Sequence, residues 1–262
     1  MDGHEPTEDQ VAIARSFVEA RRTSMGLADY PGTVPATLAE AYLVQDAAIR
    51  LDGREVVGWK VGRITPPREG ANRLAGPIFA DQVTLEDGAA MPVIARGFAA
   101  AEAEYLLRIG TAPDPSKLHY SLHEARALID AVHVGIEIAS SPFIGINDGG
   151  PAVTISDFGN NNGLLVGAEA DGWQTGDIND WRVELTIDGV PIGDATARTM
   201  LDGPFGAARF LFEHLAARGI PARPGQWISS GAVTGVHLVT VGQRVEARFD
   251  GRLAVTCTIK AQ

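Results

Sequence analysis

From residue 54 onward the chain consists of short apolar segments separated by turn residues, and this pattern constrains its fold most strongly. Segments such as "REVVGWKVGRI", "RGFAAAEAEYLLRIG", "AVHVGIEIA" and "GLLVGAE" are bounded by Gly, Pro or Asp, as β-strands are. "WRVELTIDGVPIG" and "RVEARFDGRLAVTCTI" each contain an Asp-Gly pair, which predicts a β-hairpin. We also expect "GPIFA" and "PAVTIS" to be strands. Residues 54–262 are therefore predicted to form a mixed-β catalytic domain.

Four segments have the features of helices instead. "TEDQVAIARSFVEA" opens with Thr7 and Gln10 in capping-box spacing, and "TLAEAYLVQDAAIR" opens with Thr37 and Glu40 in the same spacing. Residues 1–53 are therefore predicted to be a small helical N-terminal segment. "SLHEARALIDAV" and "PFGAARFLFEHLAARG" are predicted to be helices within the β-rich region. Because strands and helices do not alternate regularly, the pattern favours an α+β fold over a doubly wound or TIM-barrel fold.

The composition argues against several classes of function. With 45% hydrophobic and 21% charged residues, the chain has the composition of a globular protein. A net charge of −11 disfavours a nucleic-acid partner, since phosphate contacts need a basic surface. The sequence has no apolar run of about 18 residues, so we expect no membrane span. An acidic start without a hydrophobic region, and Cys257 as the single cysteine, lead us to expect a cytoplasmic location.

Two carboxylates interrupt the apolar segment "AAAEAEYLLRI". In a strand Glu102 and Glu104 would lie on one face, ~7 Å apart at the backbone, where their charges repel. Glu137 lies in a second apolar strand and also needs a partner. Three carboxylates suit Mg²⁺ or Mn²⁺, which prefer oxygen ligands. Pairing of each Glu with a cation such as Arg96 or Arg108 is the alternative, and spacing alone does not decide between them.

Lys60 lies in the apolar segment "VVGWKVGRI", between Gly58 and Gly62. Burial of a lysine lowers its pKa, which suits it to proton transfer near neutral pH. The flanking glycines allow close approach of another backbone or of a ligand. A lysine that extends from a strand end to solvent is the alternative.

With these residues identified, the chain resembles the fumarylacetoacetate hydrolase superfamily, and within it the branch of 2-keto-4-pentenoate hydratases and 4-oxalocrotonate decarboxylases. The resemblance covers nearly the whole chain in order, through "AYLVQDA", "GWKVGRI", "AEAEYLLRI", "GIEIASSPF", "GLLVG", "GAARFLFEHLAARGIPARPGQ" and "SSGAVTG". It implies a mixed β-roll with a small helical N-terminal segment, in homo-oligomers built from dimers. It also implies roles for individual residues: Glu102, Glu104 and Glu137 as metal ligands, Lys60 and Asp157 as catalytic residues, and Gly231 and Thr234 as substrate-binding residues.

The sequence departs from the family pattern at two positions. Hydratases of this branch usually have an acid in the stretch that corresponds to "NRLAGPIF", where this chain has Leu74. Asn160, in "SDFGNNNGLLVG", lies where C–C hydrolases of the superfamily typically have lysine. The second departure argues against a fumarylacetoacetate hydrolase activity, and the first leaves the hydration chemistry open.

The resemblance implies a metal-dependent lyase that adds water to a short unsaturated 2-oxo acid through a metal-stabilised enolate. The alternatives are a 2-oxo-3-hexenedioate decarboxylase, an acylpyruvate-type hydrolase and a catalytically silent 2-oxo-acid-binding subunit. A decarboxylase substrate carries a second carboxylate, for which Arg63 and Arg209 are possible contacts. We expect a small 2-oxo acid as the substrate, no nucleic-acid or membrane partner, and a place in aromatic catabolism.

Overall fold

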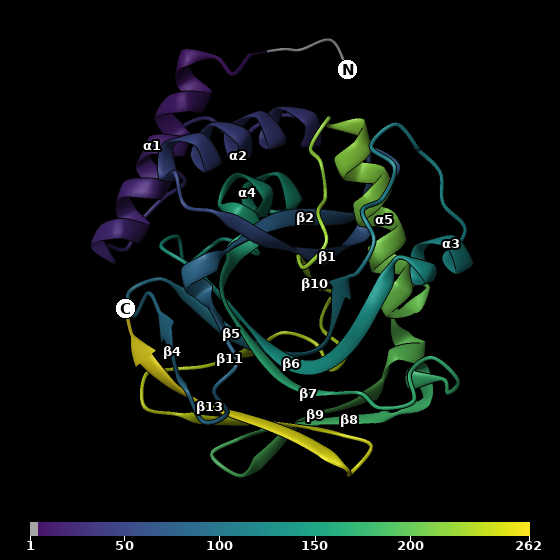
Figure 1. Cartoon of the computed structure of the whole chain (residues 1–262). Helices are drawn as coiled ribbons and strands as arrows, with labels where there is room; N and C mark the ends of the chain where they lie inside the picture. Colours follow the sequence, from purple (N-terminus) through teal and green to yellow (C-terminus); the bar gives the residue numbers. More distant parts are fainter. Residues whose placement is uncertain (1–4) are drawn as a thin grey trace.

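The computed structural model describes residues 5–262 and confirms an α+β fold built on two mixed sheets (Figure 1). The larger sheet has the strand order β2-β1-β10-β5-β6-β7-β3, and β11 pairs with β5. The smaller sheet has the order β4-β13-β12-β8-β9. None of the helices within residues 5–262 has the length and apolar character needed to cross a membrane.

The strands of the larger sheet are β1 (Val56–Arg68), β2 (Ala71–Phe79), β3 (Val83–Thr84), β5 (Phe98–Ile109), β6 (Ile129–Ser141), β7 (Asn161–Glu169), β10 (Trp227–Ser229) and β11 (His237–Leu238). Those of the smaller sheet are β4 (Ala90–Val93), β8 (Arg182–Ile187), β9 (Val190–Thr196), β12 (Arg244–Phe249) and β13 (Leu253–Ala261). The helices of the described part are α1 (Glu8–Thr23), α2 (Leu38–Asp52), α3 (Leu122–Ala127), α4 (Pro151–Ser156) and α5 (Gly203–Ala217). Single 3₁₀ turns are η1 (Ala80–Gln82), η2 (Phe158–Asn160), η3 (Ile178–Asp180) and η4 (Ala197–Thr199).

The main hydrophobic core lies between the two sheets. Side chains of β5 and β6 pack against β8, β12 and β13, and the rings of Tyr105 and Phe249 meet edge to face with centroids 5.4 Å apart. The predicted hairpins β8–β9 and β12–β13 are confirmed, with positive φ angles at both residues of each Asp-Gly turn. Cys257 is buried in this core, as predicted.

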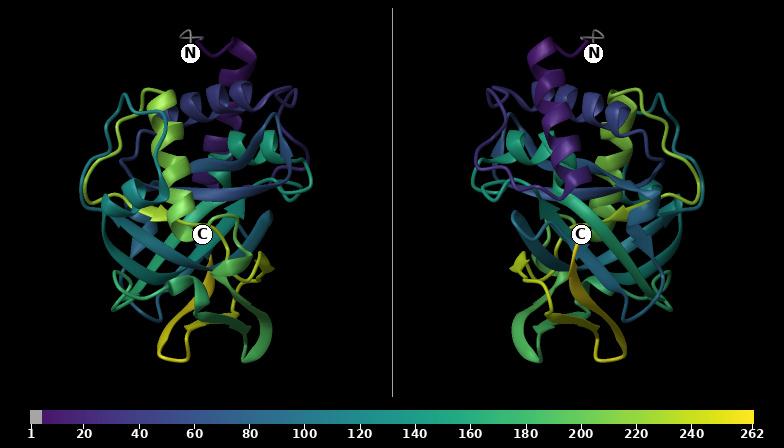
Figure 2. Two further views of the ribbon diagram at one scale, coloured as in Figure 1. Left: turned by 90° about the vertical axis from the view of Figure 1, so that its right-hand side faces the viewer. Right: turned by 90° about the vertical axis from the view of Figure 1, so that its left-hand side faces the viewer.

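Helices α1 and α2 lie side by side over β2 and η2 (Figures 1 and 2). The Thr7–Gln10 capping box is present, and the Thr37 side chain accepts a hydrogen bond from the Glu40 amide. Their apolar faces form a second core with Phe79 and Phe158. Both helices lie within the predicted segment 1–53, of which residues 1–4 lie outside the described part. Whether 1–53 and 54–262 act as separate domains stays a prediction.

Two predicted elements are wrong. "PAVTIS" forms helix α4 rather than a strand, with Pro151 in its first turn and residues 152–156 all buried. A short apolar run that is buried on all sides does not reveal its period, so strand and helix look alike in the sequence. The helix predicted over 121–132 ends at Ala127, because Ile129 already pairs with Ile109 in the larger sheet.

Arg21 of α1 joins the N-terminal helices to the larger sheet. The side chain is 3% exposed, and its Nε and Nη2 donate to the Asp157 carboxylate over 2.5 and 2.9 Å. The same guanidinium donates to the carbonyl of Ser140, the carbonyl of Asn161 and the side chain of Asn162. The buried Arg21 guanidinium therefore attaches helix α1 to the start of β7 through the hydrogen bonds described above.

Removal of this carboxylate is expected to destabilise the fold strongly. Asp157→Ala leaves the Arg21 charge buried without its partner, which should lower the free energy of unfolding by about 3–5 kcal/mol. Asp130→Ala is the matched control, because its partner Arg108 is exposed and such pairs contribute little. Urea unfolding of both variants tests this expectation. Equal losses of stability would contradict it.

Candidate metal centre and active site

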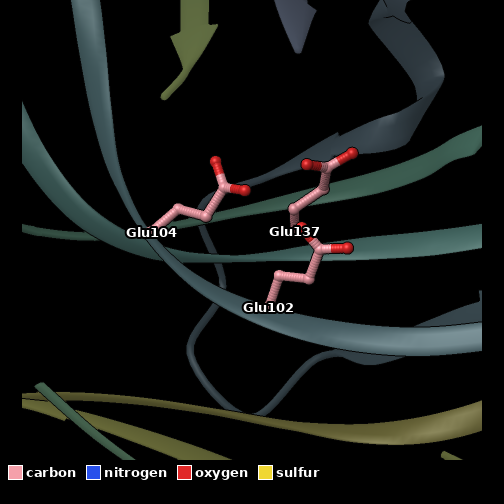
Figure 3. Close-up of side chains that lie close together, drawn as sticks. All are labelled: Glu102, Glu104 and Glu137. Carbon is pink, nitrogen blue, oxygen red and sulfur yellow. The ribbon is translucent and has the colours of Figure 1, made fainter. Parts of the chain in front are cut away.

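Three glutamates from two adjacent strands of the larger sheet point into one space (Figure 3). Glu102 and Glu104 lie two residues apart on β5, so they share a face of the sheet. Glu137 of β6 is the direct cross-strand neighbour of Glu102. One carboxylate oxygen from each residue lies within 4.8 Å of the others. The structure therefore brings together the three residues that the sequence singled out.

Burial makes this cluster electrostatically unfavourable when it holds no cation. Glu102 is 4% exposed and the other two glutamates are fully buried. Burial raises the pKa of Glu102 to about 7, with Lys60 opposing the shift and Glu137 adding to it. Burial, followed by the charges of Glu137 and Glu102, raises the pKa of Glu104 well above its ordinary value. The protons of this cluster are therefore shared among interacting carboxylates.

A divalent cation matches what these carboxylates lack. Oε1 of Glu104 is buried and has no hydrogen-bond partner among residues 5–262. Three carboxylates within ligand distance of one point offer the oxygen donors that hard cations such as Mg²⁺ and Mn²⁺ bind. The alternative, in which an arginine such as Arg108 pairs with the glutamates, is less favourable, because Arg108 pairs with Asp130 at the surface. The residues present thus fit a divalent metal.

Neighbouring polar groups hold the glutamates in this arrangement. The Ser229 hydroxyl and the backbone amide of Gly231 both donate to Oε2 of Glu104, the amide over 2.9 Å. The Asn161 side chain donates to Oε1 of Glu137 over 2.9 Å. These bonds hold Oε2 of Glu104 and Oε1 of Glu137 and fix the direction of both carboxylates, as outer-shell partners do in metal sites.

Lys60 lies beside the cluster, with Nζ 3.6 Å from Oε1 of Glu137 and 3.3 Å from Oδ1 of Asn160. Its side chain is buried, so the alternative of a lysine that extends to solvent is wrong. Burial lowers the pKa of Lys60, but the charges of Glu137 and its neighbours outweigh that effect and raise the pKa. The expected lowered pKa is therefore wrong for the metal-free protein, because the glutamates stabilise the ammonium form.

The segment of residues 157–162 packs closely on β1 and β2 and presents Asn160 to Lys60. A Cβ on Gly76 of β2 would lie 2.1 Å from the carbonyl oxygen of Phe158, so this approach requires glycine. Sequence reasoning noted Asn160 only as a departure from the family and missed its contact with Lys60. Three consecutive buried asparagines, Asn160 to Asn162, are the signal that could have pointed to it.

The structure places Asp157 away from the cavity that Lys60 lines. Both carboxylate oxygens are bound by Arg21, and the residue is fully buried. The catalytic role expected for Asp157 stays a prediction. Its observed contacts show how the 157–162 segment is anchored.

A cavity of about 1070 Å³ opens beside the glutamate cluster and is lined by Lys60 and Glu102. Gly231 and Thr234, predicted to bind substrate, line the same cavity. Gly231 has a φ of 106°, and a Cβ there would lie 3.1 Å from the carbonyl oxygen of Val61. Leu74 forms part of the wall at the position where the family pattern has an acid.

Metal binding is expected to release protons and to strengthen as pH rises. At about pH 6, below its pKa of about 7, Glu102 is mostly protonated, so a cation must displace that proton. Calorimetric titration with Mg²⁺ or Mn²⁺, in buffers of different ionisation enthalpy, should detect more proton release at about pH 6 than at about pH 8. Glu104→Gln should abolish binding, whereas Glu19→Gln on the exposed surface of α1 should not. Proton release that does not change with pH would contradict this assignment.

Comparison with known proteins adds to this geometry. No family model matches the chain. The 2-hydroxyhexa-2,4-dienoate hydratase of Comamonas testosteroni is 25% identical over 251 residues, which cover 92% of this chain and 93% of that protein. The likeness therefore extends over nearly the full length of both sequences.

Solved structures share the fold. The 4-oxalocrotonate decarboxylase of Pseudomonas putida G7, complexed with magnesium and adipate, has a TM-score of 0.79 at 20% identity, covering 96% of this chain and 97% of that one. The fumarylpyruvate hydrolase of Pseudomonas aeruginosa, in complex with Mn²⁺ and pyruvate, has a TM-score of 0.59 at 16% identity, covering 78% and 89%. The solved structures show that the chain shares their fold, and the hydratase relative is similar to it over nearly the full length of both chains, in agreement with the resemblance seen in the ordered motifs.

Proposed function

We propose that this enzyme is a divalent-metal-dependent hydro-lyase that adds water to a short unsaturated 2-oxo or 2-hydroxydienoic acid. The observation that carries the proposal is the position of Lys60, which lies 3.6 Å from Glu137 on the wall of the cavity beside the three carboxylates. A metal-binding group and a proton-transfer group thus face one ligand-sized space. The hydratase relative supports addition of water as the reaction.

Glu102, Glu104 and Glu137 would hold the metal, with Mg²⁺ or Mn²⁺ as the proposed ion. Structures of family members in complex with magnesium, calcium and manganese support a divalent ion. When bound, the ion supplies positive charge that stabilises the enolate form of a 2-oxo acid. The bonds from Ser229 and the Gly231 amide would keep Glu104 oriented while substrate enters.

Lys60 would move the proton that converts enol to ketone and back. Oδ1 of Asn160 accepts a hydrogen bond from Nζ and so holds the amine toward the cavity. The charges of the glutamates keep this amine protonated in the metal-free protein. Neutralisation of those charges leaves burial as the main influence, which favours the neutral amine that a general base requires.

Because Leu74 replaces the acid of the family pattern, proton transfer in this cavity would depend on Lys60. Leu74 is buried and apolar, and it lines the cavity with Ile64 and Val233. Such walls accommodate the carbon chain of a short substrate and exclude bulk water from it. Lys60 is therefore the proton-transfer group that this wall leaves beside the glutamate cluster.

Decarboxylation of 2-oxo-3-hexenedioate is the second candidate, and the lining of the cavity by Arg63 and Arg73 favours it. The first half of the reaction would be the same, because departure of CO₂ also leaves an enolate. We further propose that the enzyme acts as a homo-oligomer built from dimers in the cytoplasm, in aromatic catabolism, and without a nucleic-acid or membrane partner.

An absorbance assay with 2-hydroxypenta-2,4-dienoate and Mg²⁺ or Mn²⁺ tests the hydratase activity, with the product identified by mass. Lys60→Met should lower kcat by about 10²- to 10⁴-fold, because it removes the proton-transfer group. Lys117→Met is the control, since that lysine pairs with Glu124 at the surface. Release of CO₂ from 2-oxo-3-hexenedioate, with no loss of the dienoate, would instead assign a decarboxylase. Metal binding without turnover of either substrate would favour a silent binding subunit.

A further inference from the structure

Turn η2 adopts a left-handed backbone between α4 and β7. The φ angles of Phe158, Gly159 and Asn160 are 56°, 63° and 60°. Glycine adopts such angles readily, whereas they are unfavourable for a bulky residue such as Phe158. The ring of Phe158 packs against Phe79 in the buried core and keeps the turn in place. The fold therefore maintains local strain, which in proteins commonly places a functional side chain.

The turn places Asn160 between Lys60 and Asn147. Asn160 is 3% exposed, its Oδ1 accepts a hydrogen bond from Nζ of Lys60 over 3.3 Å, and its Nδ2 donates to Oδ1 of Asn147 over 3.0 Å. An ammonium group only donates hydrogen bonds, so the amide oxygen of Asn160 must face Lys60 and the amide nitrogen must face Asn147. The oxygen of Asn147 therefore faces Asn160, which directs Nδ2 of Asn147 away from this contact.

The loop that carries Asn147 is fixed by its neighbours. Ile146 is fully buried and packs in a small core with Val153 of α4. The Thr154 hydroxyl lies 3.1 Å from the carbonyl oxygen of Ile146 and 3.3 Å from that of Gly150. Asn147 itself is exposed, but the backbone on both sides of it is held by these contacts. Its side chain therefore has a defined place at the cavity.

Asn147 brings unused hydrogen-bond donors to the cavity beside Lys60. It lines this cavity, and its Nδ2 donates to no residue within the described range 5–262. Two hydrogen bonds and one amide group separate Nζ of Lys60 from Asn147, so both residues can contact one small ligand. Leu74 lines the same cavity without offering a hydrogen bond. The amide of Asn147 therefore suits recognition of a ligand oxygen, and it does so without exchanging a proton.

We propose that Asn147 binds the oxygen atom that is added to the substrate. Its Nδ2 donates to the incoming water and, after the addition, to the new hydroxyl group at C4. In this step an O–C4 bond forms, the electron pair of the C3=C4 double bond moves into the enolate, and the proton that leaves the water returns at C3 through Lys60. The inference rests on the proposed function, which places the 2-oxo carboxylate end of the substrate at the glutamate cluster.

Calorimetry with Mg²⁺ and two saturated 2-oxo acids of equal chain length tests this contact. 4-Hydroxy-2-oxopentanoate should bind the wild type about three- to tenfold more tightly than 2-oxopentanoate, since the two differ by one hydrogen-bonding group. Asn147→Leu should remove this preference, and Asn147→Gln should retain part of it. Asn72→Leu is the matched control, because Asn72 is exposed on β2 and should leave the preference unchanged.

A second measurement separates binding of the water from a structural role. Hydrogen exchange at C3 of 2-oxopentanoate in D₂O, followed by NMR, reports proton transfer by Lys60 without addition of water. Asn147→Leu should lower kcat for hydration of 2-hydroxypenta-2,4-dienoate by about tenfold or more and leave the exchange rate unchanged. Asn160→Leu should lower both rates, because Asn160 contacts Lys60 as well as Asn147.

Equal affinity of the wild type for both acids, or a preference that survives in Asn147→Leu, would overturn the inference. An equal loss of exchange and hydration in Asn147→Leu would also overturn it, because Asn147 would then act only through Lys60. Failure of the proposed function gives a different result. A wild type that prefers the hydroxy acid through Asn147, but hydrates no dienoate, supports the hydroxyl contact and rejects the hydro-lyase.

Discussion

Repulsion among Glu102, Glu104 and Glu137 is the constraint on which the arrangement of the site depends. Three carboxylates in a buried, low-dielectric space face one lysine, so charge alone does not balance. Hydrogen bonds from Ser229 and Gly231 on one side, and from Asn161 on the other, provide part of the compensation. Two segments far apart in the chain must therefore converge on the same pair of strands. A divalent cation completes the balance, which couples metal binding to the order of both segments.

Helix α1 takes part in this convergence from a distance. Arg21 binds Asp157, and the same guanidinium reaches the carbonyl of Asn161 and the side chain of Asn162. The side chain of Asn161 in turn donates a hydrogen bond to Glu137. The N-terminal helices therefore support the position of a glutamate that they do not touch. The buried aromatic pair Phe79 and Phe158, with centroids 5.1 Å apart, packs the same segment against the helices.

Local patterns predicted those parts of the structure that depend on local geometry. The period of two along a strand placed Glu102 and Glu104 on one face, and the Asp-Gly turns located both hairpins. The pairing of Glu102 with Glu137 depends on register between strands joined through α3, which no local pattern specifies. The same limit explains why "PAVTIS", buried on all sides, was assigned to the wrong element. It also explains the pKa of Lys60, because burial was visible in the sequence whereas the neighbouring charges were not.

The cavity has an apolar wall beside the glutamate cluster, and this wall constrains the reaction. Under the proposed function, a 2-oxo acid held at the glutamates would have its carbon chain beside Leu74, where the family pattern has an acid. An apolar side chain at this position does not activate water, so a proton must be exchanged through Lys60 or through the substrate itself. Because addition of water and loss of CO₂ would use the same enolate, the choice between them would follow from which carbon of the substrate faces Nζ of Lys60.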